Sequence, residues 1–310
     1  MKTIDILSFG EPLYEFSELP QDETPTRYLS GFGGDTSNFA VSAARQGASV
    51  AMLTQLGQDV FGDKFIALWQ QEKVNTDFVR RHNTAPTGIY FITHDEEGHH
   101  FTFYRKGSAA SLFQPGDLSQ EAIKRARLLH TSAITLAISD SASDSVFAAL
   151  ELARKHETLV SFDTNLRLKL WPLARARAVI HEVARLVDIC LPSLDEARLL
   201  TGLQDADAIA DFYLRLGVKH LVLKMGSEGA MYANSHQRLR VAGHRVATVD
   251  ATGAGDCFSG AFLTQFLSGS APAEALRYAN AAAALTTTGY GAVAPVPSRV
   301  DVDTFLHSLR

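Results

Sequence analysis

A glycine-rich turn followed by an aspartate stands out in the sequence VDATGAGDCFSGAF, residues 249–262. The pattern predicts the end of a strand, a turn, and an apolar helix that begins near Asp256. The glycines allow the backbone N–H groups of Gly253, Ala254 and Gly255 to point toward one anion at the positive end of that helix. Because a carboxylate beside a phosphate site can accept a proton from a hydroxyl group, the segment indicates phosphoryl transfer with Asp256 as the base. In isolation, a glycine turn with Asp256 as a simple N-cap is the alternative.

Short apolar runs rich in β-branched residues alternate with amphipathic stretches along the rest of the chain. This alternation predicts an α/β fold with a mostly parallel sheet that is covered by helices on both faces. Polar or glycine-rich groups follow three of the apolar runs, at residues 163–167, 193–196 and 225–229. Ligands of such folds bind beyond the carboxyl ends of the strands, so we expect these groups to face one cleft.

Two stretches depart from this rhythm, at about residues 12–32 and 87–105, and both alternate with a period of two. The second predicts an antiparallel hairpin that turns at residues 95–98. We interpret the two stretches as a small β-sheet lid on a single domain that spans residues 1–310. A lid suits phosphoryl transfer, because the site must exclude water. An antiparallel extension of the main sheet is the alternative.

Composition narrows the class of function. The chain has 310 residues, 46% of them hydrophobic, and a net charge of -5 with scattered basic residues, which favours small-molecule chemistry over binding to nucleic acid or an anionic membrane. Cys190 and Cys257 show no spacing typical of a disulfide framework or a metal site, which fits a reducing cytoplasm. No signal peptide and no apolar stretch of roughly 20 residues is apparent. P-loop, dinucleotide and hydrolase-elbow motifs are also missing from the sequence.

The segment 249–262 resembles the signature of the ribokinase-like (phosphofructokinase B) carbohydrate kinases. Three further motifs of that family follow its order, and the resemblance extends from Gly10 to about residue 297. They are GFGGDTSNFA at 31–40, LKMGSEGA at 223–230 and RYANAAAA at 277–284. The resemblance implies a ribokinase-like three-layer αβα sandwich with a small β lid, and ATP with Mg²⁺ as the phosphoryl donor.

On the nucleotide side, the resemblance implies contacts from three regions of the chain. MGSEG alone is also an acceptable tight turn between two strands. The implied nucleotide-binding residues are Asn165, Arg167, Lys224, Gly226, Ser227, Gly229, Gly253, Ala254, Gly255 and Asn280.

Within the family, the chain is most similar to the 2-keto-3-deoxygluconate kinases, through GEPLYEF, GGDTSN, TGIYF, FYRKGSAAS, HTSAIT and DTNLRLKLW. This similarity implies transfer of the γ-phosphate of ATP to the terminal hydroxyl of 2-keto-3-deoxygluconate. The implied sugar-binding residues are Gly34, Asn38, Tyr90, Tyr104, Arg105, Ile134 and Arg167. The two arginines supply forked donors suited to a carboxylate, which a neutral sugar does not need. A fructokinase or another neutral-sugar kinase is the alternative, followed by a catalytically idle sugar-sensing relative.

The metal sites are also implied by the resemblance, with one departure. Relatives usually have Asn-x-x-Glu near the magnesium site, whereas this chain has Ser193 in place of the asparagine and retains Glu196, which can hold a magnesium-bound water. Asp250 and Thr252 lie where some relatives bind a monovalent cation such as K⁺, although an aspartate at the end of a strand also caps turns. The sugar acid and ATP are the expected partners, and the apolar lid offers a surface for homo-oligomers.

Overall fold

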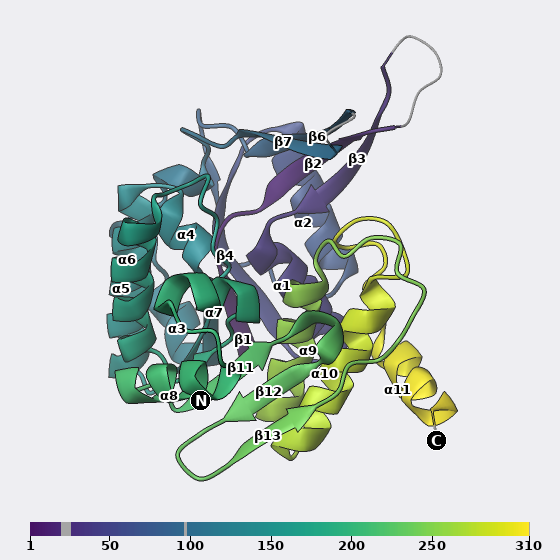
Figure 1. Ribbon diagram of the computed structural model, residues 1–310. Coiled ribbons are helices and arrows are strands. Elements are labelled where there is room, and N and C mark those ends of the chain that lie inside the picture. Colours follow the sequence, from purple (N-terminus) through teal and green to yellow (C-terminus); the bar gives the residue numbers. More distant parts are fainter. Residues whose placement is uncertain (20–25, 96–97, 310) are drawn as a thin grey trace.

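The computed structural model describes residues 1–19, 26–95 and 98–309, and its centre is a nine-stranded sheet (Figure 1). Its strands are β1 (Ile4–Phe9), β4 (Val50–Gly57), β5 (Val79–His82), β8 (Ala126–Ser132), β9 (Leu159–Asp163), β10 (Ile189–Cys190), β11 (His220–Lys224), β12 (Ala230–Ala233) and β13 (Arg238–Val241). The order across the sheet is β13-β12-β11-β10-β9-β8-β1-β4-β5. Strands β12 and β13 pair antiparallel at one edge and the others pair parallel, as the alternating sequence pattern predicted.

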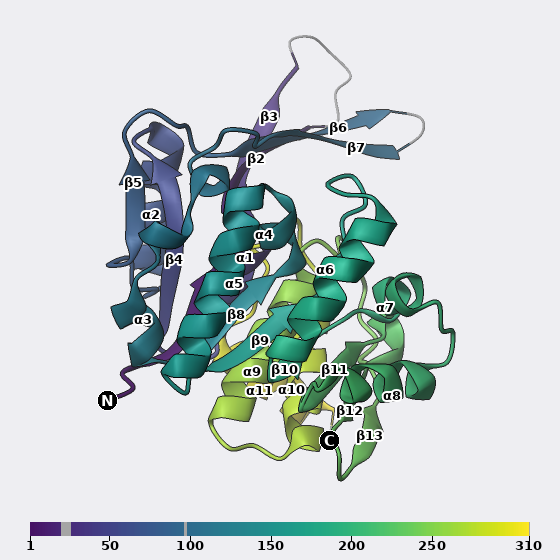
Figure 2. The same cartoon turned by 90° about the vertical axis from the view of Figure 1, so that its left-hand side faces the viewer.

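Helices cover both faces of this sheet, so the three-layer αβα architecture is confirmed (Figure 2). One face carries α1 (Asp35–Arg45), α2 (Val60–Gln71), α9 (Ala254–Leu267), α10 (Pro272–Thr286) and α11 (Arg299–Ser308). The other carries α3 (Gln120–Arg125), α4 (Ala133–Ala137), α5 (Asp140–Lys155), α6 (Leu173–Leu186), α7 (Leu194–Thr201) and α8 (Ala206–Leu216). Side chains alternate across each strand, so Ile6 packs in the core with Phe39 and Phe262, whereas Leu7 packs in the opposite core with Val146.

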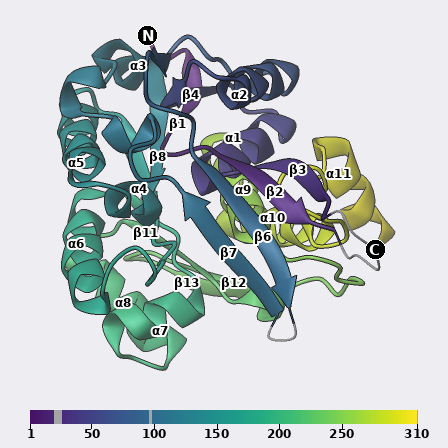
Figure 3. The ribbon, with the colours of Figure 1, turned by 90° about the horizontal axis from the view of Figure 1, so that it is seen from above.

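A second, four-stranded sheet lies beside the carboxyl ends of the parallel strands (Figures 1 and 3). This small sheet consists of β2 (Leu13–Glu18), β3 (Tyr28–Gly33), β6 (Ile89–Asp95) and β7 (Gly98–Tyr104), in the order β3-β2-β6-β7. Strands β6 and β7 form the predicted hairpin, whose turn residues 96–97 lie outside the described residues, as do residues 20–25 of the first predicted lid stretch. The alternative of an antiparallel extension of the main sheet is wrong, because within the described residues these four strands pair only with one another.

One predicted strand is absent from the described residues. Residues 242–253 contain no strand, although the sequence predicted one that ends before the glycine turn. The N–H groups of Val249 and Asp250 instead donate to the carbonyl oxygen of Thr287, at 2.7 and 3.2 Å, so this segment is held by the end of α10. No helix in the described part of the chain is both long and apolar enough to cross a membrane.

Candidate active site

A cavity of about 1100 Å³ lies between the carboxyl ends of the parallel strands and the small sheet. It brings together residues from both sheets and from the starts of α1, α4 and α9. The predicted site residues that line it are Gly34, Asn38, Tyr90, Arg105, Ile134, Asn165, Arg167, Glu196, Lys224, Gly226, Thr252, Gly253, Gly255 and Asp256. The cleft expected from the sequence is therefore present, and most of the motifs meet in it.

The first turn of α9 forms one wall of the cavity. Gly253 is its N-cap, with φ of 74°, and a Cβ atom there would lie 2.8 Å from the carbonyl oxygen of Ala292, so only glycine fits without strain. The N–H group of Ala254 donates to the carbonyl oxygen of Ala251 at 3.2 Å, and Ala254 does not line the cavity. Gly253 and Gly255 do line it. The N–H group of Ala254 is therefore already used within the turn. The predicted anion site is left with the open first turn of the helix, without the N–H group of Ala254.

Asp256 lies in this turn with its carboxylate facing α1. Asn38 Nδ2 donates to Asp256 Oδ2 at 2.8 Å, which fixes one carboxylate oxygen. Burial raises the pKa of Asp256 to about 8, the negative charges of Asp35 and Asp163 act in the same direction, and Asn38 and Lys224 oppose them. A carboxylate with this proton affinity can act as a general base near neutral pH.

A buried ion pair lies beside the helix N-terminus. Lys224 Nζ is 2.5 Å from Asp163 Oδ2, and Ser259 Oγ donates to the same oxygen at 3.1 Å. Burial lowers the pKa of Lys224, but the charges of Asp163 and Glu196 outweigh it and leave the pKa raised. The ammonium is close to Gly255, because a Cβ atom added to this glycine would lie 3.6 Å from Lys224 Nζ. Lys224 can therefore offer a positive charge to an anion bound at the first turn of α9.

Glu196 lies in the first turn of α7, across the cavity from the predicted lid. Its Oε2 accepts a hydrogen bond from Thr164 Oγ1 at 2.9 Å, and its Oε1 lies 3.5 Å from Arg167 Nη1. The residue in the usual asparagine position, Ser193, uses its hydroxyl to cap α7 by accepting from the N–H of Glu196. A hard cation prefers oxygen ligands and keeps several waters, so the carboxylate of Glu196 fits a role in holding Mg²⁺-bound water. No cluster of three metal-ligating side chains was found among the described residues.

The wall formed by the small sheet is aromatic. Phe101 and Phe103 line the cavity, and the ring of Phe103 stacks on Tyr90 at a centroid distance of 5.4 Å. The hydroxyl of Tyr90 donates to the buried carboxylate of Glu15. Burial, followed by the charge of Glu15, raises the pKa of Tyr90. The Tyr90 oxygen therefore remains a hydrogen-bond acceptor toward the cavity.

Tyr104 does not reach the cavity, contrary to the sequence prediction. It lies on the opposite face of β7 from Phe103 and Arg105, is 63% exposed, and contacts the ring of Phe91. The physical reason is the two-residue period of a strand, which prevents neighbours such as Tyr104 and Arg105 from facing the same side. The same period could have identified Phe101 and Phe103 from the sequence, because both share the face of Arg105.

Arg105 forms an ion pair that the sequence did not reveal. Its Nε donates to Glu11 Oε2 at 2.9 Å, and its Nη2 contacts the same oxygen. Both side chains are largely buried, and the guanidinium also lies over the ring of Phe103 at 5.2 Å. Burial raises the pKa of the Glu11 carboxyl, while Arg105 opposes this rise. Much of the Arg105 charge is therefore already balanced before any ligand binds.

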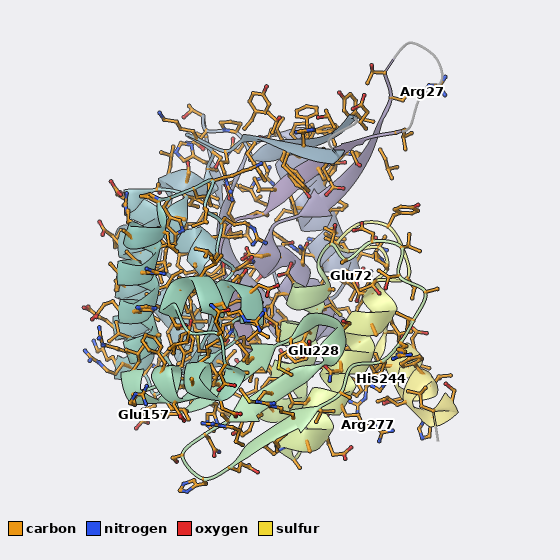
Figure 4. All side chains as sticks on the ribbon, in the orientation of Figure 1. Arg27, Glu72, Glu157, Glu228, His244 and Arg277 are labelled. Carbon is orange, nitrogen blue, oxygen red and sulfur yellow. The ribbon has the colours of Figure 1, made fainter. Side chains whose placement is uncertain are left out.

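Besides Ala254, three predicted nucleotide contacts lie outside the cavity lining: Ser227, Gly229 and Asn280. Ser227 is in the exposed 3-10 turn Gly226–Glu228, which Glu228 marks in Figure 4. Gly229 is required by packing, since a Cβ atom would lie 2.1 Å from the carbonyl oxygen of Val241. Asn280 is buried, and its Nδ2 donates to the carbonyl oxygens of Val241 and of residue 242, each at 3.1 Å.

The two residues predicted for a monovalent cation form a turn. Asp250 Oδ1 accepts from the N–H and the hydroxyl of Thr252 at 2.9 and 2.6 Å, and its Oδ2 accepts from the N–H of Gly291 at 2.9 Å. Asp250 therefore caps a turn, and the monovalent-cation site stays a prediction. Thr252 lines the cavity and Asp250 does not.

Several cavity residues were missed by the sequence-based interpretation. They include Glu11, Asp35, Phe101, Phe103, Lys106 and Lys169. Asp35 stands inside the motif GGDTSN, which the sequence had already indicated. Asp163 begins the motif DTNLRLKLW and lines the cavity, as expected for residues 163–167, although no role of its own was predicted for it. Asn165 Nδ2 donates to Asp35 Oδ2 at 2.8 Å, which joins the two motifs across the cavity.

Comparisons with known proteins agree with this geometry. The family model described as pfkB family carbohydrate kinase matches residues 3–299. The chain is 35% identical to 2-dehydro-3-deoxygluconokinase of Thermoproteus tenax, covering 99% of this chain and 95% of that protein. It is 33% identical to Fructokinase-1 of Oryza sativa subsp. japonica, covering 96% of each. The structure of fructokinase with bound ATP from Xylella fastidiosa matches with a TM-score of 0.91 at 26% identity, covering 98% of each chain.

Proposed function

Because this chain belongs to the pfkB family of carbohydrate kinases, we propose that it phosphorylates a keto-deoxy sugar acid with ATP. The acceptor that we propose is 2-keto-3-deoxygluconate, and the product is its 6-phosphate. One observation carries the reaction class: a partly buried carboxylate with high proton affinity, Asp256, lies in the open first turn of α9 at a large cavity. A base beside an anion site is the arrangement that phosphoryl transfer to a hydroxyl requires.

In the proposed mechanism, the γ-phosphate of ATP binds at the first turn of α9 between Gly253 and Gly255. Asp256 accepts the proton of the attacking terminal hydroxyl through the carboxylate oxygen that Asn38 leaves free. Lys224 and the N–H groups of the helix offset the negative charge that moves with the phosphoryl group. Glu196 would hold water on Mg²⁺, whose charge neutralises the phosphates when it is bound. The small sheet closes over the acceptor and excludes bulk water.

Arg167 is the cation that we assign to the carboxylate of the sugar acid. Its side chain is about half exposed in the cavity, and its contact with Glu196 is long, at 3.5 Å. Arg105, in contrast, is already paired with Glu11. Arg167 therefore retains donors for an incoming carboxylate. The sequence pointed to both arginines, and we now assign the main contact with the carboxylate to Arg167 alone. The 35% identity to 2-dehydro-3-deoxygluconokinase of Thermoproteus tenax supports the same acceptor.

A fructokinase or another neutral-sugar kinase is the second candidate, and the Arg105–Glu11 ion pair is the observation that favours it. A balanced pair can bind sugar hydroxyls through its remaining donors and acceptors without a charged ligand. The 33% identity to a fructokinase over nearly the whole chain also fits this candidate. An assay of ADP release with 2-keto-3-deoxygluconate, its galacto epimer, fructose and ribose decides between the two. Turnover of neutral sugars alone would reject the proposed acceptor, and binding without ADP release would favour an idle relative.

Arg167→Ala is expected to raise KM for 2-keto-3-deoxygluconate by about tenfold to a hundredfold, because a charge-assisted hydrogen bond contributes about 1.5–3 kcal/mol. KM for any neutral sugar that turns over should change less than threefold. Steady-state kinetics with both classes of acceptor at saturating ATP measures this difference. The exposed Arg154 on α5 provides the control, and Arg154→Ala should leave both KM values unchanged. Equal increases for acid and neutral acceptors would contradict the assignment of Arg167 to the carboxylate.

The face of the small sheet that carries Phe91 also carries the exposed aromatic side chains of Tyr28 and Tyr104. Self-association through this sheet remains part of the proposal, because clustered exposed apolar groups often mark an interface. Both cysteines are buried free thiols, which fits the reducing cytoplasm that we also propose.

A further inference from the structure

We propose that Arg45 is a positioning residue that holds the segment 291–297 against the turn before α9 and thereby sets the position of the phosphate site. This inference rests on the proposed binding of ATP at the first turn of α9. Arg45 is the last residue of α1 and lies outside the cavity lining, so it acts on the site through the segment that it binds. The sequence motifs assigned it no role.

Arg45 uses all three nitrogens of its guanidinium. Nε and Nη2 donate to the two carboxylate oxygens of Glu72, the C-cap residue of α2, at 2.9 and 2.7 Å. Nη1 donates to the carbonyl oxygens of Val293 and Val296 at 3.0 and 2.5 Å. The side chains of Arg45 and Glu72 are only 22% and 13% exposed. The planar fork therefore fixes the segment relative to the ends of α1 and α2.

The segment 291–297 packs against the turn that begins α9. The N–H group of Gly291 donates to Asp250 Oδ2 at 2.9 Å. The next residue, Ala292, lies directly against the N-cap of the helix. A Cβ atom added to Gly253 would lie 2.8 Å from the carbonyl oxygen of Ala292 and 2.9 Å from its Cα atom. Because the two backbones are in contact, a displacement of the segment would change the position of the N-cap.

Arg45 is the third polar contact along one face of α1. Asn38, Ser42 and Arg45 are spaced by four and then three residues, so their side chains share a face of the helix. Asn38 Nδ2 donates to Asp256 Oδ2 at 2.8 Å. Ser42 Oγ donates to the carbonyl oxygen of Cys257 at 3.0 Å. These two contacts bind α9 itself, and Arg45 binds the segment behind its N-cap, so α1 positions the base and the phosphate site together.

The far end of the segment is held separately. Gln46 Nε2 donates to the carbonyl oxygen of Pro297 at 2.8 Å, and Gln46 Oε1 accepts from the hydroxyl of Tyr278 at 2.8 Å. Gln46 is fully buried. A variant of Arg45 therefore loses the restraint beside Ala292 and keeps the one at residue 297, so we expect the chain to fold.

A purely structural role is the competing explanation, in which Arg45 only stabilises the fold. It predicts a lower free energy of unfolding, with the kinetic constants of the folded enzyme unchanged. A positioning role predicts weaker binding of ATP and an unchanged KM for the acceptor, because the predicted acceptor-binding residues belong to other segments of the chain. The two explanations therefore differ in the constants for ATP.

The test is Arg45→Met, which keeps an unbranched side chain and removes every donor. We expect Kd and KM for ATP to rise by about tenfold or more, because bonds from a charged donor are lost and the site is displaced. KM for the acceptor found most active should stay within about threefold of wild type, since its contacts are retained. Calorimetric titration with ATP, ADP release and urea unfolding measure these quantities on the folded protein.

Two controls separate the positioning role from stability. Arg127 makes the same kinds of contact at the other end of α9, with Asp5 Oδ1 at 2.9 Å and the carbonyl oxygen of Leu267 at 2.6 Å. Arg127→Met should leave Kd and KM for ATP unchanged. Glu72→Gln removes the ion pair but leaves the donors of Arg45 to the segment, so it should lower stability and leave Kd for ATP unchanged.

Wild-type affinity for ATP in folded Arg45→Met would overturn the inference, as would equal losses for ATP and the acceptor. If Arg45→Met does not fold, Arg45→Lys decides, because lysine keeps a cation beside Glu72 without the planar fork, and a smaller loss of ATP affinity is expected. The proposed function is tested separately. A wild-type enzyme that releases no ADP with any acceptor would reject the proposed reaction, whereas Kd for ATP would still decide the role of Arg45.

Discussion

Asp256→Asn is expected to lower kcat by about a thousandfold, within the range of 10²–10⁴ that a general base contributes. The amide has nearly the same shape as the carboxylate, so its hydrogen bond with Asn38 can be retained in a flipped form. The N-terminal turn of α9 remains intact, and affinity for ATP should therefore change little. Steady-state ADP release measures kcat, and calorimetric titration with ATP measures the binding that should persist.

A matched control separates base catalysis from helix capping. Asp301 also lies in the first turn of a helix, α11, where its carboxylate completes a capping box with Ser298. Asp301→Asn should therefore alter stability by about 1 kcal/mol and leave kcat unchanged. Turnover of Asp256→Asn within about tenfold of the wild-type value would reject Asp256 as the base. The simple N-cap role that the sequence left open is wrong, because Gly253 is the N-cap of α9 and no side chain caps this helix.

The main architecture was predictable because its signals are local. Apolar runs that alternate with amphipathic stretches specify a parallel sheet with two helical layers, and the period-two pattern of residues 87–105 specifies the hairpin of β6 and β7. The glycine turn before Asp256 similarly combines all its elements within a few residues. The strand predicted before this turn was wrong because its hydrogen-bond acceptor, the carbonyl of Thr287, belongs to a helix end far along the chain.

Partners that are distant in the sequence were the part that could not be predicted. Arg105 was expected to face a ligand carboxylate, but Glu11, 94 residues earlier, occupies two of its donors. Asn165 was expected near the phosphates, and its amide also reaches Asp35 across 130 residues. Residue type alone does not identify Glu11 or Asp35 as these partners. They are brought to Arg105 and Asn165 only by the topology, which places the ends of β1 and β9 and the start of α1 around one cavity. Tyr104 is a different case, since the alternation of β7 was already contained in the sequence.

Lys224→Met is expected to damage both stability and catalysis, and the two effects can be separated. Removing one partner of a buried ion pair leaves the other charge unpaired, which costs about 3–5 kcal/mol. The side chains of Lys224 and Asp163 are only 14% and 6% exposed, so water cannot replace the lost partner effectively. We also expect kcat to fall by about a hundredfold or more, because the ammonium lies beside the anion site at Gly255. Urea unfolding and ADP release measure the two quantities.

The double variant Lys224→Met with Asp163→Asn distinguishes the two roles. It removes the unpaired carboxylate, so most of the lost free energy of unfolding should return, whereas kcat should stay low because no cation is restored. Lys219, which pairs with Asp188 just before β11 and is 69% exposed, is the matched control, and Lys219→Met should cost less than about 1 kcal/mol. Recovery of kcat together with stability in the double variant would mean that Lys224 serves only to neutralise Asp163. Asp163 raises the pKa of Asp256 and Lys224 lowers it. The double variant removes both charges, so the acidic limb of the kcat/KM profile should move only slightly.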